Sequence, residues 1–188
     1  NYVNNLNVGR ISSRTFPVSS EGEGEGVLIM DACSVTALGI KQILMQSCGI
    51  SDAINVVQTL ADITSHVASS PPALLIMDIC GENELMLDGL RLLAHLRETH
   101  PTMKMVICTD FSDYRVLELL VSSKAHGILL KHEPALALTQ CVTRGILRSR
   151  QWLSPRVQQL LAKTPPKNTA RTARELEVLA CLFSGQSV

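Results

Sequence analysis

The sequence has no net charge and no long hydrophobic run, and each absence excludes a class of protein. Seventeen lysines and arginines balance seventeen aspartates and glutamates, so the chain as a whole has no electrostatic attraction for nucleic acid or a membrane surface. No apolar run approaches the roughly 18 residues of a membrane span, and no charged-then-apolar leader begins the chain. We therefore expect a cytoplasmic protein without a membrane partner.

The six cysteines lack the close pairing of a zinc site or a disulfide framework. Most of them lie in apolar or helical patterns, where a free cysteine behaves as a small hydrophobic residue, so a reducing compartment is expected. A glycine-rich phosphate-binding loop is also missing, because Asp31-Ala32-Cys33-Ser34 follows the first predicted strand. This argues against a flavodoxin-like or nucleotide-binding enzyme, and we expect no enzymatic activity.

Strand and helix patterns alternate from residue 27 to residue 147. Hydrophobic residues make up 46% of the 188 residues, enough for one domain and a small appendage. Apolar strands are predicted at 27–31, 54–57, 74–78, 103–109 and 127–131, and helices at 34–49, 60–69, 89–99, 112–123 and 134–147. The short connections require right-handed crossovers. The predicted fold class is therefore α/β, a doubly wound five-stranded parallel sheet with helices on both faces.

Four of the predicted strands end in a polar residue: Asp31, Asp78, Thr109 and Lys131. Because the carboxyl ends of parallel strands share one edge of a sheet, these side chains are expected to converge. A carboxylate accepts a phosphoryl group when a divalent cation, an ammonium group and a hydroxyl neutralise the phosphate oxygens. The alternative interpretation is four unrelated polar residues that cap strands.

The strand ends resemble those of response-regulator receiver domains over about residues 27–147. The similarity rests on Met30-Asp31, Leu75-Ile76-Met77-Asp78, Ile107-Cys108-Thr109, Gly127-Ile128-Leu129-Leu130-Lys131 and Asp88-Gly89. Within that family the chain is most similar to the NarL/LuxR-type regulators, above all the Rcs phosphorelay regulators RcsB and RcsA. The resemblance implies a CheY-like (flavodoxin-like) fold and a sensor kinase or phosphotransfer protein as partner.

The resemblance also implies a role for each strand-end residue. Asp78 would be the phosphoacceptor, Thr109 the switch hydroxyl and Lys131 the phosphate partner. Asp31, Asp78 and the backbone carbonyl of Cys80 would be the ligands of Mg²⁺.

Several positions depart from the receiver pattern. Ala32 stands where the family usually has a second acidic residue and a direct magnesium ligand, so we expect Mg²⁺ to bind weakly or not at all. Gly81-Glu82 replaces the usual Met-Pro, and Glu82 or Glu84 could supply a substitute carboxylate. The run at 29–39 is closer to RcsA. These departures support an alternative function, a phosphorylation-independent receiver that acts as an auxiliary heterodimer partner of an RcsB-like regulator.

The two ends of the chain differ in character from residues 27–147. Residues 1–26 are polar and end in alternating Glu and Gly, which predicts a flexible tail. Residues 148–169 are predicted to be an interdomain linker. Residues 170–188 resemble the first helix of a LuxR-type helix-turn-helix, with Thr172 and Glu175 as a capping box. Because the recognition helix comes later in that motif, we expect sequence-specific DNA binding only from a complete carboxyl-terminal domain.

Association with a second receiver is expected through the fourth helix, fifth strand and fifth helix, the face that the resemblance implicates. The partner would be a second copy or an RcsB-like regulator. Charged residues at 115, 118 and 124 would surround a modest interface. Its candidate residues, some of which must point inward, are Tyr114, Leu117, Leu120, Val121, His126, Ala135, Leu138 and Val142.

Overall fold

The structure, a computed structural model, describes residues 24–50 and 53–163. Nearly all of the predicted tail and all of the predicted start of a helix-turn-helix lie outside the described residues. None of the helices within the described ranges is long and apolar enough to cross a membrane.

The strands form one parallel sheet in the order β2-β1-β3-β4-β5-β6. The order reverses at β1, as in a doubly wound sheet with crossovers to either side of its first strand. The predicted parallel α/β fold is confirmed, and a sixth strand is added to the five that were predicted. The bounds are β1 (Val27–Met30), β2 (Ile54–Val57), β3 (Leu74–Met77), β4 (Lys104–Thr109), β5 (Gly127–Leu130) and β6 (Trp152–Leu153).

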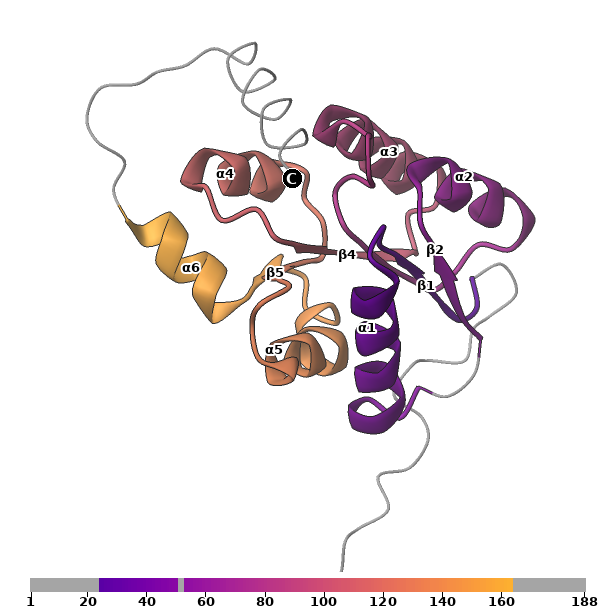
Figure 1. Ribbon diagram of the computed structural model, residues 1–188, viewed down its shortest axis with the longest axis horizontal. Helices are drawn as coiled ribbons and strands as arrows, with labels where there is room; N and C mark the ends of the chain where they lie inside the picture. The colour runs from indigo at the N-terminus through magenta and orange to yellow at the C-terminus, as the bar shows by residue number, and fades with distance from the viewer. Residues whose placement is uncertain (1–23, 51–52, 164–188) are drawn as a thin grey trace, which may run out of the picture.

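Helices cover both faces of the sheet, with α2, α3 and α4 on one face and α1 and α5 on the other (Figure 1). Helix α6 packs against α4 and β5. The bounds are α1 (Ser34–Ser47), α2 (Leu60–Ser69), α3 (Met86–Thr99), α4 (Tyr114–Ser122), α5 (Ala135–Gln140), the π-helix η1 (Cys141–Gly145) and α6 (Pro155–Ala162).

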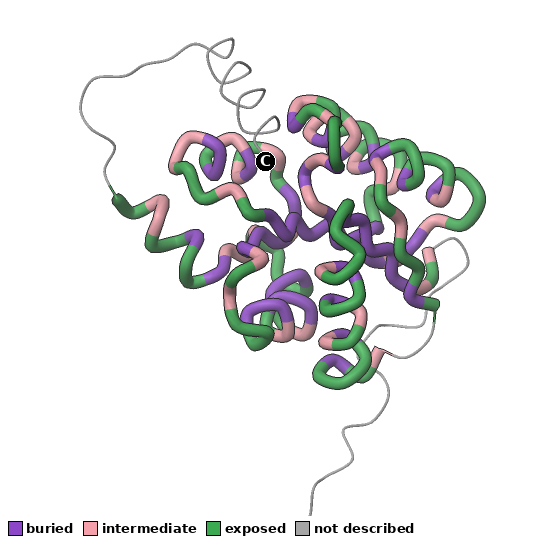
Figure 2. The backbone as a smooth tube through the Cα atoms, viewed as in Figure 1, coloured by how far each residue is buried: buried purple, intermediate pink, exposed green. Residues whose placement is uncertain are grey.

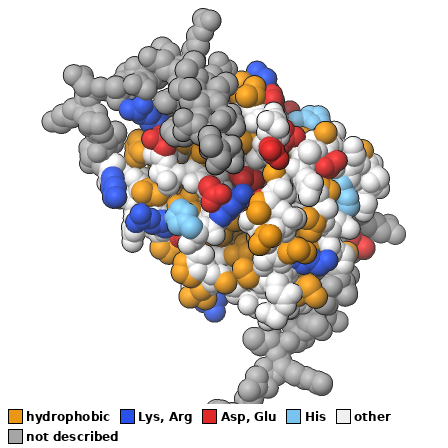
Figure 3. Space-filling view, in the orientation of Figure 1, with side chains coloured by type: hydrophobic (Ala, Val, Ile, Leu, Met, Phe, Trp, Pro, Cys, Tyr) orange, Lys and Arg blue, Asp and Glu red, His pale blue; other side chains and the backbone are white. Residues whose placement is uncertain are grey.

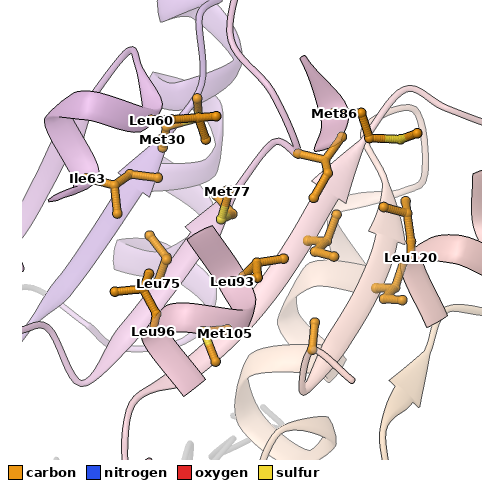
Figure 4. Packing of buried hydrophobic residues seen from close by; sticks show 14 of the residues in the cluster. Met30, Leu60, Ile63, Leu75, Met77, Met86, Leu93, Leu96, Met105 and Leu120 are labelled. Atoms are coloured by element: carbon orange, nitrogen blue, oxygen red, sulfur yellow. The ribbon is translucent and has the colours of Figure 1, made fainter. Parts of the chain in front are cut away.

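The central strands are buried along their whole length, which explains their continuous apolar sequence (Figure 2). Successive side chains still point to opposite faces. In β1, Leu28 and Met30 pack toward α2, α3 and α4, while Val27 and Ile29 pack toward α1 and α5. Figure 4 shows the first of these two clusters, in which residues of β1, β3 and β4 meet Leu93 and Leu96 of α3. The sheet is therefore held rigidly between two hydrophobic layers.

The range 148–169, expected as a linker, contains regular structure over residues 152–162. The backbone N–H groups of Trp152 and Ser154 donate to the carbonyls of His126 and Ile128, which adds β6 to the edge of the sheet. Ser154 then caps α6 by accepting from the N–H of Val157, and Pro155 is the first helical residue. Because Val157 is fully buried, this segment belongs to the folded unit.

The fifth predicted helix, 134–147, is divided into α5 and η1. A Cβ atom at Gly145 would lie 2.5 Å from the indole ring of Trp152. The absence of a side chain at Gly145 thus makes room for β6 beside η1.

Candidate functional site

The register of the central strands places Asp31 and Asp78 side by side. Met30 of β1 pairs with Met77 of β3, and each aspartate is the next residue along its strand. The N–H of Asp78 donates to the carbonyl of Met30 at 3.0 Å. Both carboxylates therefore emerge from neighbouring strands at the same edge of the sheet.

Lys131 contacts both carboxylates. It follows β5, where its N–H donates to the carbonyl of Thr109. Its Nζ atom lies 2.6 Å from Oδ2 of Asp78 and 2.8 Å from Oδ2 of Asp31. Only 11% of the Lys131 side chain and 16% of the Asp78 side chain are exposed, and Asp31 is buried. Figure 3 shows acidic and basic side chains adjoining near the middle of the face that it presents.

The charges of this site shift the pKa values of its members. Burial raises the pKa of Asp78, and the charge of Lys131 together with hydrogen bonds from Lys131, Ile79 and Thr109 offsets part of that rise. Burial alone would lower the pKa of Lys131, but the two carboxylates outweigh it and the pKa is raised. Lys131 is thus a permanent cation beside a carboxylate that stays more basic, and so more nucleophilic, than an exposed one.

Thr109 and Cys80 border the carboxylates. Thr109 is fully buried, and its hydroxyl oxygen accepts from the N–H of Phe111 at 3.4 Å while also bonding Asp78. Burial, followed by the negative charges of Asp78 and Glu84, raises the pKa of the Cys80 thiol to about 12. The sulfur of Cys80 is therefore a neutral thiol at physiological pH, and a metal ion would meet the backbone carbonyl of this residue rather than a thiolate.

Neither Glu82 nor Glu84, the two candidates for a substitute magnesium ligand, lies free beside Asp78 to bind a cation. Oε1 of Glu84 accepts from the N–H of Leu60 at 2.9 Å, and Oε2 accepts from the N–H of Gly81 at 2.7 Å. Glu84 therefore joins the loop after β3 to the start of α2, and Glu82 is exposed. Within residues 24–50 and 53–163, no group of three or more histidine, cysteine or acidic side chains is arranged to hold a metal ion.

The site still fits a hydrated divalent cation. Mg²⁺ is commonly held by one or two carboxylates and keeps several water ligands. Apart from its ionic contact with Lys131, Oδ2 of Asp31 has no hydrogen-bond partner in the part of the chain that the structure describes, although it is buried. A divalent cation that displaced the ammonium group of Lys131 would satisfy this buried oxygen.

Sequence reasoning missed two acidic residues beside this site. Asp110 follows Thr109, and its Oδ2 lies 3.8 Å from Nζ of Lys131, although 73% of the side chain is exposed. The search for polar residues at the ends of predicted strands could have found Asp110, because it directly follows the last residue of β4. Glu133 binds Ser154 and the N–H groups of Leu130 and Arg156, and no periodic pattern in the sequence points to it.

Half of the eight expected interface residues on α4, β5 and α5 and in their connections are core residues. Leu117, Leu120, Leu138 and Val142 are buried. The remaining four candidates are partly or fully exposed. The exposed large hydrophobic residues of the described ranges include three on α1 and one at the start of α5: Val35, Leu38, Met45 and Leu136 are 78%, 61%, 42% and 63% exposed.

A doubly wound parallel sheet that brings two aspartates, a threonine and a lysine to its carboxyl edge defines a receiver domain. Residues 27–143 match the family model of the response regulator receiver domain. The chain belongs to the response regulator family, and it is a regulator of the two-component type.

Individual relatives agree with this assignment. Oxygen regulatory protein NreC of Staphylococcus carnosus is 28% identical, over 85% of this chain and 77% of NreC. The isolated receiver domain of RcsB from Salmonella enterica serovar Typhimurium, in the presence of the phosphomimetic BeF₃⁻, is 16% identical, with a TM-score of 0.63 over 74% of this chain and 99% of that chain. ChrA, the response regulator of a heme-sensing two-component system, is 26% identical, with a TM-score of 0.53 over 87% and 77%. The predicted resemblance to NarL/LuxR-type regulators close to RcsB is confirmed.

Proposed function

We propose that the protein is a transcriptional regulator whose receiver domain accepts a phosphoryl group on Asp78. The observation that carries this proposal is the contact of one ammonium group, Nζ of Lys131, with Asp78 and Asp31 at 2.6 and 2.8 Å. A lysine held between two carboxylates stands where it can bind the oxygens of a phosphoryl group that arrives at either one.

The proposed transfer uses the carboxylate of Asp78 as nucleophile. One of its oxygens forms a bond to phosphorus, and the bond between phosphorus and the donor breaks, with its electron pair leaving on the donor. The product is an acyl phosphate. Lys131 exchanges part of its contact with Asp78 for the new phosphate oxygens, and the hydroxyl of Thr109 donates to one of them.

Mg²⁺ is the cation that suits this site, because hard cations prefer oxygen ligands. Asp31, Asp78 and the backbone carbonyl of Cys80 would hold it. When bound, it would neutralise charge on the phosphate oxygens. We propose weak affinity, because Ala32 supplies no ligand and Lys131 already occupies the inner oxygen of Asp31.

Incubation with acetyl phosphate and Mg²⁺, followed by mass measurement of the intact protein, tests the proposal. We expect one added phosphoryl group in the wild type and none in Asp78→Asn. Asp110→Asn is the matched control, because this neighbouring carboxylate is exposed and only 3.8 Å from the same ammonium group. Phosphorylation of Asp78→Asn at the wild-type rate would show that another residue is the acceptor.

The auxiliary-partner alternative is favoured by a different residue, Ala32, which supplies no ligand for a cation. The ion pairs of Lys131 already neutralise part of the charge of Asp31 and Asp78, so a receiver of this kind needs neither cation nor phosphate for stability. In that case the mass would stay unchanged with acetyl phosphate, while binding to an RcsB-like regulator would persist.

We propose control of transcription through the LuxR-like segment that begins near residue 170, as part of a complete DNA-binding domain. Structures of RcsB include two dimers bound to two parallel DNAs, which supports paired receivers as the arrangement. For this chain the exposed hydrophobic side chains on α1 and α5 offer the surface (Figure 3). We expect Leu38→Glu to weaken self-association in sedimentation, and charge reversal at Glu118 on α4 to leave it unchanged. The opposite result would favour the α4 face.

A further inference from the structure

A pocket of about 490 Å³ lies at the edge of the sheet opposite the carboxylates. It is formed by the end of α3, the start of β4, the loop between α4 and β5, and the segment that leads into β6. None of the residues that line it belongs to the site around Asp78, and the two share only strand β4, which contributes Met105 to the pocket and Thr109 to the site. Its lining residues are Arg97, Pro101, Met105, Lys124, Ala125, His126, Arg148, Ser149, Arg150 and Gln151.

The lining is strongly basic. Arg97, Lys124, Arg148 and Arg150 supply four positive charges, and no carboxylate lines the pocket. Among the described residues, none of these four cations forms an ion pair, so they are not neutralised by acidic neighbours. Because the chain as a whole has no net charge, these four residues form a marked local concentration of positive charge.

Two of the polar lining residues, Arg97 and Gln151, use their side chains to stabilise the fold, and the remaining cations are available to a ligand. Nη1 of Arg97 donates to the carbonyl of Ser123, and the side-chain amide of Gln151 donates to those of Val121 and Ala125. These bonds satisfy carbonyls at the end of α4 and in the loop that follows it, and the positive charge of Arg97 is favourable beside a helix C-terminus. Lys124, Arg148 and Arg150 make no such bond among the described residues, so capping of helices does not account for them.

His126 provides a fixed donor in the wall of the pocket. Its Nδ1 accepts from the N–H of Met105 at 3.1 Å, so Nε2 carries the proton of the neutral ring. Burial and the charges of Lys104 and Arg97 lower the pKa of His126 to about 4. The ring can therefore donate one hydrogen bond from Nε2, and it adds no charge at neutral pH.

We propose that this pocket binds a small ligand that carries two or more phosphate groups. Guanidinium groups bind phosphate oxygens in a bidentate way. A single phosphate group carries a charge of only about −1.5 to −2 at pH 7, so it would leave part of the four positive charges unbalanced. The volume is in the range of small-ligand sites. A concave pocket suits a compact ligand, whereas a nucleic-acid backbone needs a continuous stripe of cations. Arg156, the next arginine after Arg150 in the sequence, instead lies on α6, where its side chain bonds Gln159.

The single tryptophan gives a direct measurement of binding. Trp152 follows Gln151 of the lining, and its N–H donates to the carbonyl of His126 at 2.9 Å. The probe is inorganic pyrophosphate, titrated into the full chain in EDTA and at low salt while tryptophan fluorescence is recorded. EDTA removes divalent cations. Without such a cation, the negative charges of the carboxylates around Asp78 repel pyrophosphate, so the probe does not bind there. We expect a saturable change in the wild type and weaker binding of sulfate.

Variants locate the binding. Arg148→Ala and Arg150→Ala are each expected to weaken pyrophosphate binding about tenfold, the loss of one charged hydrogen-bonding partner. Arg144→Ala is the matched control, because Arg144 is exposed and close in sequence but outside the lining. Equal weakening in all three variants would show diffuse attraction and overturn the proposal, as would no saturable signal together with no heat of binding. Displacement of pyrophosphate by a short DNA duplex at lower concentration than by ATP would assign the surface to nucleic acid instead.

Discussion

The hydroxyl of Ser154 donates to Oε2 of Glu133 at 2.5 Å, while its oxygen accepts from the N–H of Val157. Glu133 lies two residues after Lys131, and Ser154 is the N-cap of α6. The same carboxylate accepts from the N–H of Leu130 at the end of β5. One side chain thus connects the loop that carries the site lysine to the helix that leads toward the carboxyl terminus.

Removal of the Ser154 hydroxyl should loosen this connection. Ser154→Ala eliminates a helix cap and a donor to a partly buried carboxylate, and we expect a loss of about 1–2 kcal/mol in the free energy of unfolding. Urea denaturation measures it. Ser122→Ala is the control, because that exposed hydroxyl only bonds back to the carbonyl of Glu118. Equal stability of the two variants would contradict the role assigned to Ser154.

An acidic residue at position 32 should strengthen cation binding. Ala32→Asp adds a carboxylate next to Asp31, and an added oxygen ligand favours a hard cation over Lys131. We expect tighter Mg²⁺ binding by calorimetry and faster phosphorylation by acetyl phosphate. Exposed Glu82→Gln is expected to change neither. Unaltered Mg²⁺ affinity in Ala32→Asp would show that the ion pairs of Lys131, rather than the missing ligand, limit the site.

Gly89 is expected to be intolerant of a side chain. A Cβ atom there would overlap the carbonyl oxygen of Ile79, in the loop directly after Asp78. Gly89→Ala should therefore displace α3 from this loop, with a loss of about 1–3 kcal/mol in the free energy of unfolding and slower phosphorylation.

The control for that substitution is Gly39→Ala in α1. A Cβ atom at Gly39 has no atom within 4 Å, and alanine favours a helix over glycine by about 0.5–1 kcal/mol. We expect Gly39→Ala to raise the melting temperature and Gly89→Ala to lower it. Opposite or equal shifts would contradict the close approach of α3 to the loop.

His126 should make the protein less stable in mild acid. Its pKa is about 4 in the folded protein and 6.5 as the ordinary value, so the unfolded chain binds more protons between these values. Stability is fully present above about pH 6.5 and falls as the pH drops toward 4. The full shift corresponds to about 3 kcal/mol, and because the ring is only half-buried we expect about 1–2 kcal/mol after screening.

The variant His126→Asn isolates this contribution. Asparagine keeps an acceptor for the N–H of Met105 but does not titrate, so the difference in stability between wild type and variant should shrink from pH 7 to pH 4.5. Exposed His95→Asn should leave the pH profile unchanged. A constant difference across this range would show that His126 does not titrate as stated.

The convergence of the strand ends was predictable because all strands of a parallel sheet run in the same direction. Asp31, Asp78 and Lys131 each end an apolar run, and parallel strands with short crossovers place such ends at one edge. Strand β6 and helix α6 were not predictable in the same way. A strand of two residues is too short to show the alternating hydrophobic pattern of a β-strand. In addition, Trp152 pairs with β5 only because Gly145 leaves space for its ring.

The sequence by itself determined the α/β fold class and the residues that meet at the carboxyl edge, since both follow from local hydrophobic periodicity. Only the tertiary structure decided how those residues use their charges. It joined Lys131 to both aspartates, engaged Glu84 with two backbone amides, and gathered Arg97, Lys124, Arg148 and Arg150 around one pocket. These arrangements depend on distances between residues remote in sequence, and packing fixes such distances while periodicity does not.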